Sequence, residues 1–167
     1  VAENLYLNKD YEKSKIVLKK FGKDQNFYYW YRTKKEAQIL SKTRDQKEAL
    51  NFITSQFKKI NDPNVKFLLD IANFNKSAKK YDQAIKYYSL IINSLSKEDE
   101  IKSDLLYRRG ASYERLKDYS NADKDLLHAL EINPEDAYIL NYLAYSWLER
   151  DYKIDDAIKM LEKAYLK

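Results

Sequence analysis

The chain has 167 residues, enough for one ordinary domain with a sizeable core, and only two Gly and two Pro, which disfavours an all-β fold built on tight turns. Charged residues make up 34% of the chain and both signs are intermingled, as on solvated helix faces, so we predict an all-α protein. There is no Cys, which excludes disulfides, thiolate zinc sites and a cysteine nucleophile.

The net charge of +5 is concentrated at the amino-terminal side, because residues 1–64 hold 14 basic and 8 acidic side chains. Nucleic-acid binding usually requires a concentrated basic stripe on one face. Here the lysines, for example Lys58 and Lys59, are scattered among acids. We therefore favour a solvated surface and keep nucleic-acid binding as a weaker alternative.

The chain starts at Val1 in the middle of a pattern and without an initiator Met. We therefore expect a fragment of a longer protein, from which a leader, a lipid anchor or further repeats are missing. The longest uncharged run, residues 137–148, is too short to cross a bilayer. No membrane span is predicted within this chain.

Two helical hairpins are predicted in the first part of the chain. Residues 1–26 form a partial hairpin with a turn at Asp10-Tyr11 and a helix end near Gly22, since glycine suits helix termini. Residues 27–63 form the next hairpin. Large aromatic side chains crowd its start, and we expect them to pack against the partial hairpin: Phe27, Tyr28, Trp30 and Tyr31.

A third hairpin is predicted over residues 65–98. Small side chains at Ala72 and Ala84 allow its two helices to approach closely, where longer side chains would hold them apart. The acids Glu98, Asp99 and Glu100 are expected beside the positive end of the helix that follows.

The clearest hairpin is residues 103–136, and the pattern resumes without a gap over residues 137–167. In the former, apolar, small and aromatic residues recur at helical spacing on two helices, followed by a proline: Leu106, Gly110, Tyr113, Tyr119, Ala122, Leu126, Ala129 and Pro134.

This set of residues, within a 34-residue unit, resembles a tetratricopeptide (TPR) repeat. The resemblance implies four full repeats after one partial repeat, in a single domain over residues 1–167. The implied fold is an all-α, right-handed superhelical array of antiparallel helix–turn–helix repeats, an α-solenoid. Its concave groove is lined by the first helix of each repeat.

TPR families generally bind peptides in this groove, so the resemblance implies a non-catalytic scaffold with a protein or peptide partner. The groove-facing positions carry side chains that suit peptide backbones and carboxylates. These candidate peptide-binding residues are Lys34, Gln38, Asn73, Tyr107, Arg108, Glu114, Arg115, Tyr138, Asn141 and Tyr145.

A carboxylate clamp, which some TPR domains use to hold a terminal carboxylate, is disfavoured. Lys34 is followed by Gln38, and acids stand at Asp70 and Asp104 where the clamp has Asn and Lys; only Arg108 fits. Two acids would repel a carboxylate ligand.

Catalytic chemistry has little support. His128 is the only histidine, and it lies on a second helix away from the groove. Asp123, Asp125 and His128 are scattered around that helix, so a metal site is not expected. We predict no enzyme activity, no cofactor, no metal and no small-molecule substrate.

The sequences LNYLAYSWLER and IDDAIKMLEKA are similar to carboxy-terminal repeats of bacterial TPR proteins of unassigned role. Some such proteins are envelope lipoproteins that present substrates to processing proteases. The resemblance therefore implies an adaptor in the envelope or periplasm, with the cytoplasm as the alternative.

A structural role is the second hypothesis. Apolar side chains that a following helix would cover remain near the chain's end, and terminal repeats usually carry a polar cap. These side chains, which would drive self-assembly, are Ile158, Leu161, Tyr165 and Leu166.

Overall fold

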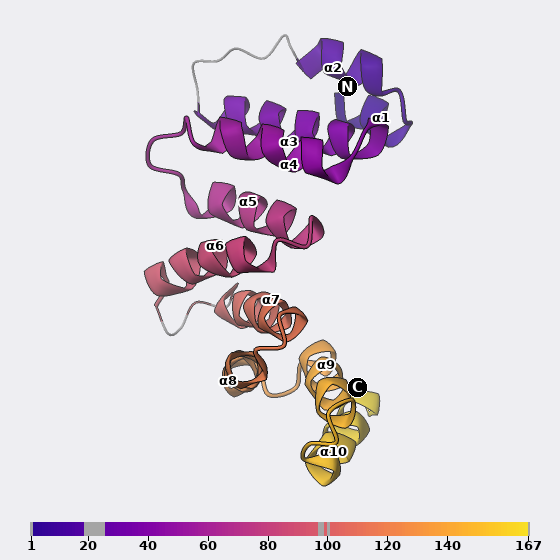
Figure 1. The fold of residues 1–167 in the computed structure, drawn as a ribbon, viewed down its shortest axis with the longest axis vertical. Coiled ribbons are helices and arrows are strands. Elements are labelled where there is room, and N and C mark those ends of the chain that lie inside the picture. Colours follow the sequence, from indigo (N-terminus) through magenta and orange to yellow (C-terminus); the bar gives the residue numbers. More distant parts are fainter. Residues whose placement is uncertain (1, 19–25, 97–98, 100, 167) are drawn as a thin grey trace. The chain divides into compact units, whose positions relative to one another are not determined.

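The computed structural model describes residues 2–18, 26–96, 99 and 101–166. Within these ranges the chain forms ten α-helices and no strand (Figure 1), which confirms the predicted all-α fold. The predicted helix end at Gly22 and the acids Glu98 and Glu100 lie outside the described residues.

The chain divides into two compact units, Val1–Lys79 and Lys80–Lys167, and within each unit consecutive helices pack side by side. The first unit holds α1 (Ala2–Leu7), α2 (Tyr11–Leu18), α3 (Asn26–Thr43), α4 (Gln46–Phe57) and α5 (Val65–Ser77). The second unit holds α6 (Tyr81–Ser94), α7 (Ile101–Arg115), α8 (Tyr119–Ile132), α9 (Ala137–Leu148) and α10 (Ile154–Tyr165). The boundary falls inside the segment predicted as the repeat 65–98, and the repeat boundaries remain a prediction.

Three of the hairpin turns within the units have the same backbone conformation. After α1, α7 and α9 one residue adopts a left-handed conformation, with φ between 51° and 61°: Lys9, Lys117 and Asp151. After α7, the Asp118 N–H then donates to the Tyr113 carbonyl five residues earlier, at 3.0 Å. Equivalent bonds follow α1 and α9. This pattern satisfies carbonyls at the helix end and reverses the chain, which makes the hairpin.

In the second unit, α7 and α8 approach closely at Gly110. A Cβ at this position would lie 3.0 Å from Leu126 Cγ and 3.2 Å from the Ala122 carbonyl oxygen. The glycine is therefore required by the separation of the two helices, because any larger residue would push them apart.

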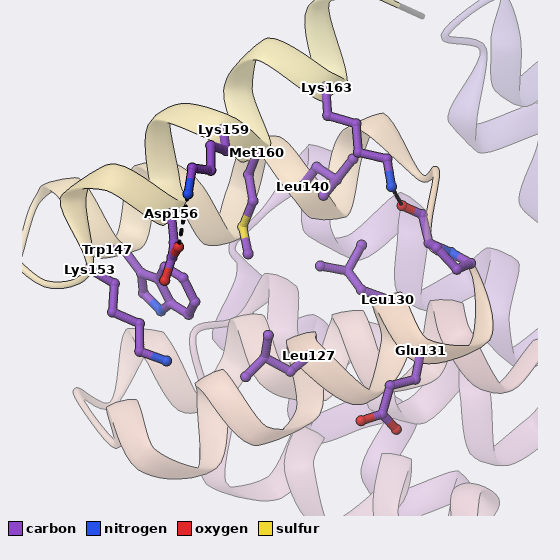
Figure 2. A pocket seen from close by; sticks show the side chains of 11 residues that line it. Leu127, Leu130, Glu131, Leu140, Trp147, Lys153, Asp156, Lys159, Met160 and Lys163 are labelled. Atoms are coloured by element: carbon purple, nitrogen blue, oxygen red, sulfur yellow. Dashed lines mark hydrogen bonds and ion pairs between the residues drawn. The ribbon is translucent and has the colours of Figure 1, made fainter.

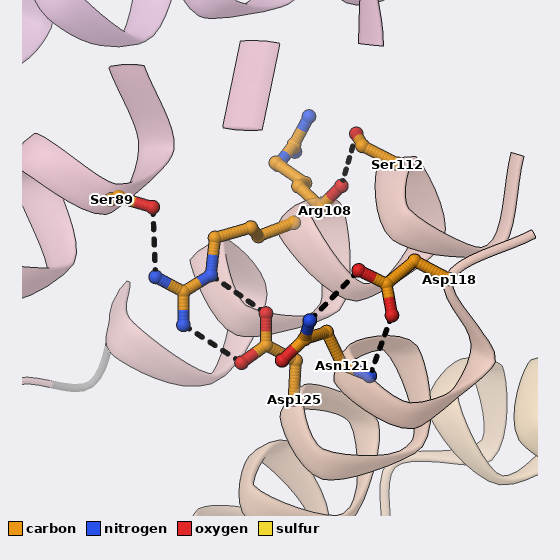
Figure 3. Close-up of polar contacts among 7 residues, drawn as sticks. Ser89, Arg108, Ser112, Asp118, Asn121 and Asp125 are labelled. Atoms are coloured by element: carbon orange, nitrogen blue, oxygen red, sulfur yellow. Dashed lines mark hydrogen bonds and ion pairs between the residues drawn. The ribbon is translucent and has the colours of Figure 1, made fainter. Parts of the chain in front are cut away.

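A buried ion pair joins three helices of the same unit (Figure 3). The Arg109 guanidinium on α7 donates to both carboxylate oxygens of Asp125 on α8, at 2.7 and 2.8 Å, and to Ser89 Oγ on α6 at 3.0 Å. Asp125 is only 4% exposed. The hydrogen bond to Asp125 raises the pKa of Arg109 above its ordinary value, so the guanidinium stays charged.

The first unit is organised around Trp30, which is 1% exposed. Its ring lies 5.5 Å from those of Phe57 on α4 and Phe67 on α5. The expectation that it packs against the partial hairpin is therefore wrong, since it faces the helices that follow. The expectation holds for Tyr31, which packs against the cluster containing Ala2 and Leu18. The side chain of Phe27 lies outside the described residues.

Candidate functional site

Each unit contains a polar cavity formed mainly by the first helices of two successive hairpins. In the first unit a cavity of about 490 Å³, the Lys34 cavity, is lined by Tyr6, Lys34, Gln38, Ser41, Lys42, Gln46, Asp70, Asn73, Phe74 and Ser77. In the second unit a cavity of about 330 Å³, the Tyr138 cavity, is lined by Tyr107, Glu114, Arg115, Tyr138, Asn141, Tyr142, Tyr145, Ser146 and Glu149. The two cavities are formed mainly by α3 with α5 and by α7 with α9.

In the Lys34 cavity the strongest charge is already neutralised. Lys34 Nζ lies 2.6 Å from Asp70 Oδ1, and the Trp30 indole donates to Asp70 Oδ2 at 3.0 Å. A carboxylate clamp would use the Lys34 ammonium to bind its ligand, but here that ammonium is already paired with Asp70. The cavity retains amide groups from Gln38 and Asn73, and Gln38 Oε1 is buried with no hydrogen-bond partner among the described residues. Amides of this kind suit the main chain of an extended segment.

Two of the tyrosines that line the Tyr138 cavity, Tyr107 and Tyr142, are in ring contact. The rings of Tyr107 on α7 and Tyr142 on α9 meet edge to face at 5.4 Å, and the Tyr142 hydroxyl donates to Glu114 Oε2 at 3.0 Å. Burial, followed by the charge of Glu114, raises the pKa of Tyr142, so the phenol remains a neutral donor. Burial likewise raises the pKa of Tyr107.

The lining of the same cavity also includes exposed aromatic side chains of α9. Tyr138 is 84% exposed and Tyr145 is 57% exposed. Their positions, with Asn141 between them, fall on one helix face because residues three and four apart are neighbours. Asp136 sets the start of this helix by accepting from the backbone N–H groups of Tyr138 and Ile139, at 3.0 and 3.1 Å.

The mouth of the Tyr138 cavity carries both signs of charge. Arg115 Nε lies 3.6 Å from Glu114 Oε2, and Glu149 is exposed. An exposed guanidinium, two carboxylates and tyrosine rings can together contact backbone amides and charged or aromatic side chains.

Most of the predicted site residues gather in these two cavities. Lys34, Gln38 and Asn73 line the first, and the second is lined by Tyr107, Glu114, Arg115, Tyr138, Asn141 and Tyr145. Arg108 lines neither, and its Nε donates to Asp104 Oδ2 at 2.7 Å. Sequence reasoning overlooked Tyr142, although it stands one helical turn after Tyr138 and so points into the same groove.

A third cavity was not predicted at all. This Met160 cavity, of about 630 Å³, lies among α8, α9 and α10 (Figure 2) and is lined by Leu127, Leu130, Glu131, Pro134, Leu140, Trp147, Lys153, Asp156, Lys159, Met160 and Lys163. In the sequence, Leu127 and Leu130 could have indicated this cavity, because they extend the apolar stripe of α8 beyond its buried core positions.

Reactive groups are spread out across the described helices. His128 is exposed on α8, Asp123 Oδ1 accepts from Arg150 at 2.8 Å, and Asp125 is held by Arg109. Over the residues that the structure describes, no group of three or more His, Cys, Asp or Glu is arranged to hold a metal ion. Among the same residues, no helix combines the length and apolar character that a membrane crossing needs.

The described part of the chain is an array of helical hairpins, and one of its segments matches a known repeat family. The tetratricopeptide repeat family model matches residues 103–136, so this stretch is a tetratricopeptide repeat and the resemblance seen in the sequence is confirmed. Over 85 residues, 51% of this chain, the sequence is 36% identical to TPR repeat-containing protein MJ1428 of Methanocaldococcus jannaschii. The match spans 14% of that relative's length.

Solved structures show the same fold. A crystal structure of MamA has a TM-score of 0.73 at 14% identity, covering 99% of this chain and 92% of that chain. A MamA fragment, 41-end, from Desulfovibrio magneticus RS-1 has a TM-score of 0.75 at 12% identity, covering 98% and 89%. At these identities the likeness concerns the fold alone. The TPR fold is typical of scaffolds for protein–protein interaction.

Proposed function

We propose that this chain is a non-catalytic scaffold that binds a peptide or protein segment, and that the Tyr138 cavity is its principal contact site. The observation that carries the proposal is a cavity lined by two exposed tyrosines, Tyr138 and Tyr145, and by the Tyr107–Tyr142 ring pair, whose Tyr142 hydroxyl donates to Glu114.

Two physical arguments support this role. A tyrosine presents a large contact area and loses little conformational entropy on binding, which is why it is enriched among residues that dominate binding energy. The ring contact between Tyr107 and Tyr142 and the hydrogen bond from Tyr142 to Glu114 hold part of the cavity lining in place. A bound segment would therefore meet a preorganised surface, with Asn141 available to its backbone.

The side chains of the Tyr138 cavity favour binding over catalysis. Its members are tyrosines, one asparagine, one serine, one arginine and two glutamates, and Glu114 already accepts from Tyr142. Neither an activated nucleophile nor a histidine base belongs to this set. An adaptor role in a bacterial envelope complex, which the sequence resemblance implies, is part of the proposal.

Site-directed photocrosslinking tests the proposal. A photoreactive phenylalanine at Tyr138 should capture a partner in cells that express the full-length protein, and the same residue at Tyr165 provides a control, because Tyr165 is 90% exposed on α10. The captured segment, synthesised as a labelled peptide, is then titrated against the purified protein.

We expect Tyr138→Ala with Tyr145→Ala to weaken binding of this peptide by at least about 30-fold, since one dominant tyrosine typically contributes about 2 kcal/mol. Tyr165→Ala should leave it unchanged. Equal capture at both positions, or equal affinity of both variants, would reject the Tyr138 cavity as the binding site.

Self-association is a second candidate, favoured by the apolar side chains that α10 exposes. Tyr165, Leu166 and Ile158 are 90%, 83% and 46% exposed. Sedimentation of the full-length protein and of its Ile158→Glu variant separates this role from peptide capture. An association that the substitution abolishes supports assembly, whereas a monomer at every concentration removes this candidate.

A further inference from the structure

The Met160 cavity is an apolar trough with three walls. Leu127 and Leu130 on α8 form one wall, Met160 on α10 forms the opposite wall, and Leu140 and Trp147 on α9 lie between them (Figure 2). Its volume of about 630 Å³ is within the range of ligand-binding pockets in proteins. The space accommodates several large apolar side chains of a partner.

The length of the trough fits a helix. Leu140 and Trp147 are seven residues apart on α9, which places them two turns and about 10.5 Å apart along the axis. An amphipathic helix presents apolar anchors at matching intervals of three, four and seven residues. Met160 is well suited to this contact, because its unbranched thioether adapts to different neighbours.

The α10 wall is the positively charged side of the trough. It has three lysines, namely Lys153 just before α10 and Lys159 and Lys163 on it, and one acid, Asp156. Asp156 Oδ1 lies 4.0 Å from Lys159 Nζ. Lys163 Nζ donates to the Pro134 carbonyl at 2.8 Å, across one end of the trough.

At the other end, Lys153 Nζ lies 4.9 Å from the centre of the Trp147 ring. The opposite wall contributes only Glu131 as a charged group among the residues that line the cavity. An occupant that places carboxylates along α10 therefore gains charge complementarity over the whole length of this wall.

We propose that the Met160 cavity binds an amphipathic helix of a partner protein, with its apolar anchors in the trough and its acidic flank against α10. This site is independent of the proposed peptide contact at the Tyr138 cavity. The two cavities use different faces of α9, because Tyr145 and Trp147 are separated by about 200° around the helix axis.

The chain supplies its own reporter, since Met160 is the only methionine in the sequence. Methyl-¹³C methionine labelling gives one signal, which arises from the wall of the trough. The probe is a synthetic amphipathic helix of about four turns, with leucines at the anchor positions and glutamates along one flank. The matched control helix has lysines in place of the glutamates.

We expect the acidic helix to shift the Met160 signal saturably, with an affinity that falls as salt is added, and the lysine helix to bind about tenfold more weakly. Lys159→Glu with Lys163→Glu should reverse this preference. If the double variant unfolds, the single variant Lys159→Glu tests the charge preference instead. Its side chain is 75% exposed, so this replacement should not disturb the fold. Tyr138→Ala should leave the titration unchanged.

Three results would overturn the proposal. The first is the absence of any shift with either helix. The second is equal binding of the acidic and lysine helices, which would remove the charge argument. The third is a Met160 signal that moves with protein concentration alone, which would make a second copy of this chain the occupant.

Discussion

The Lys34 cavity and the Tyr138 cavity occupy corresponding places in the two units but use their side chains differently. In the first unit, Lys34 and Asp70 neutralise each other at 2.6 Å. In the second unit, the Tyr142 hydroxyl donates to Glu114, and Tyr138, which lines the same cavity, is 84% exposed.

This difference indicates which groove is available for binding. A pair of opposite charges that satisfy each other presents little unbalanced charge to a ligand, and a competing carboxylate would have to displace Asp70. Exposed aromatic rings need no such displacement. We therefore expect the second unit to contribute more of the binding energy than the first.

Each unit has its own spectroscopic reporter for testing this contrast. Trp30 in the first unit and Trp147 in the second are 1% and 2% exposed, so the fluorescence of each reports unfolding of its surroundings. Trp30→Phe isolates the second unit and Trp147→Phe isolates the first.

The largest effect is expected from Asp125→Ala in the Trp30→Phe background. Removal of this buried carboxylate leaves the partly buried Arg109 guanidinium without its ion-pair partner, which costs up to about 3–5 kcal/mol of unfolding free energy. Urea denaturation measures it. Asp104→Ala is the control, because its side chain is 52% exposed and exposed pairs contribute about 0–1 kcal/mol. Similar losses for the two variants would contradict the structural role of the buried pair.

The next effect concerns alkaline pH. Burial raises the pKa of Tyr88 on α6 from 10.0 to about 12. Between these values the unfolded chain loses a proton that the folded chain keeps, so stability is complete below pH 10 and falls as pH rises toward 12. The expected loss is up to about 3 kcal/mol. Tyr88→Phe should reduce this slope in urea titrations of the second unit, while Tyr107 and Tyr142, whose pKa values are also raised, retain their contributions. An unchanged slope would contradict the assignment.

Gly110→Ala tests the close approach of α7 and α8. The added methyl group would meet the Ala122 carbonyl oxygen and Asp125 Cβ, both at 3.2 Å, and these atoms cannot move without shifting α8. We expect a loss of about 1–3 kcal/mol in the second unit. Ala111→Gly, one residue further along α7, is the control for altered backbone entropy. A gain in stability for Gly110→Ala would show that helix propensity outweighs the contact.

The smallest effect, Asp70→Asn, should make the two cavities more alike. An asparagine can still accept from the Trp30 indole, but it no longer neutralises Lys34. We expect the first unit to lose about 1–2 kcal/mol, since the pair is only partly buried. Acetylated peptides with a free carboxylate should then bind the Lys34 cavity more tightly in this variant. No gain in their binding would show that the ion pair is not what limits access.

The sequence predicted the helical architecture because helices depend on local spacing. The recurrence of small and aromatic residues, together with few Gly and Pro, indicated helical hairpins, and residues 103–136 carried the repeat pattern clearly. The groove positions implied by the TPR resemblance selected ten candidate site residues, and nine of them line the two cavities. Their role in binding remains a prediction.

The pairing of side chains across helices could not be read from spacing. Arg108 looked like a groove residue but lies against Asp104, whereas its neighbour Arg109 forms the buried pair with Asp125. Trp30 turned toward α4 and α5 rather than toward the partial hairpin.

By itself, the sequence determined the fold class and the helix faces, since both follow from the order of residues within one or two turns. Only the tertiary structure decided that Lys34 is neutralised by Asp70, that Tyr142 donates to Glu114, and that Met160 lies in a trough. Each of these depends on distances between residues far apart in the chain, and those distances are set by how neighbouring helices pack.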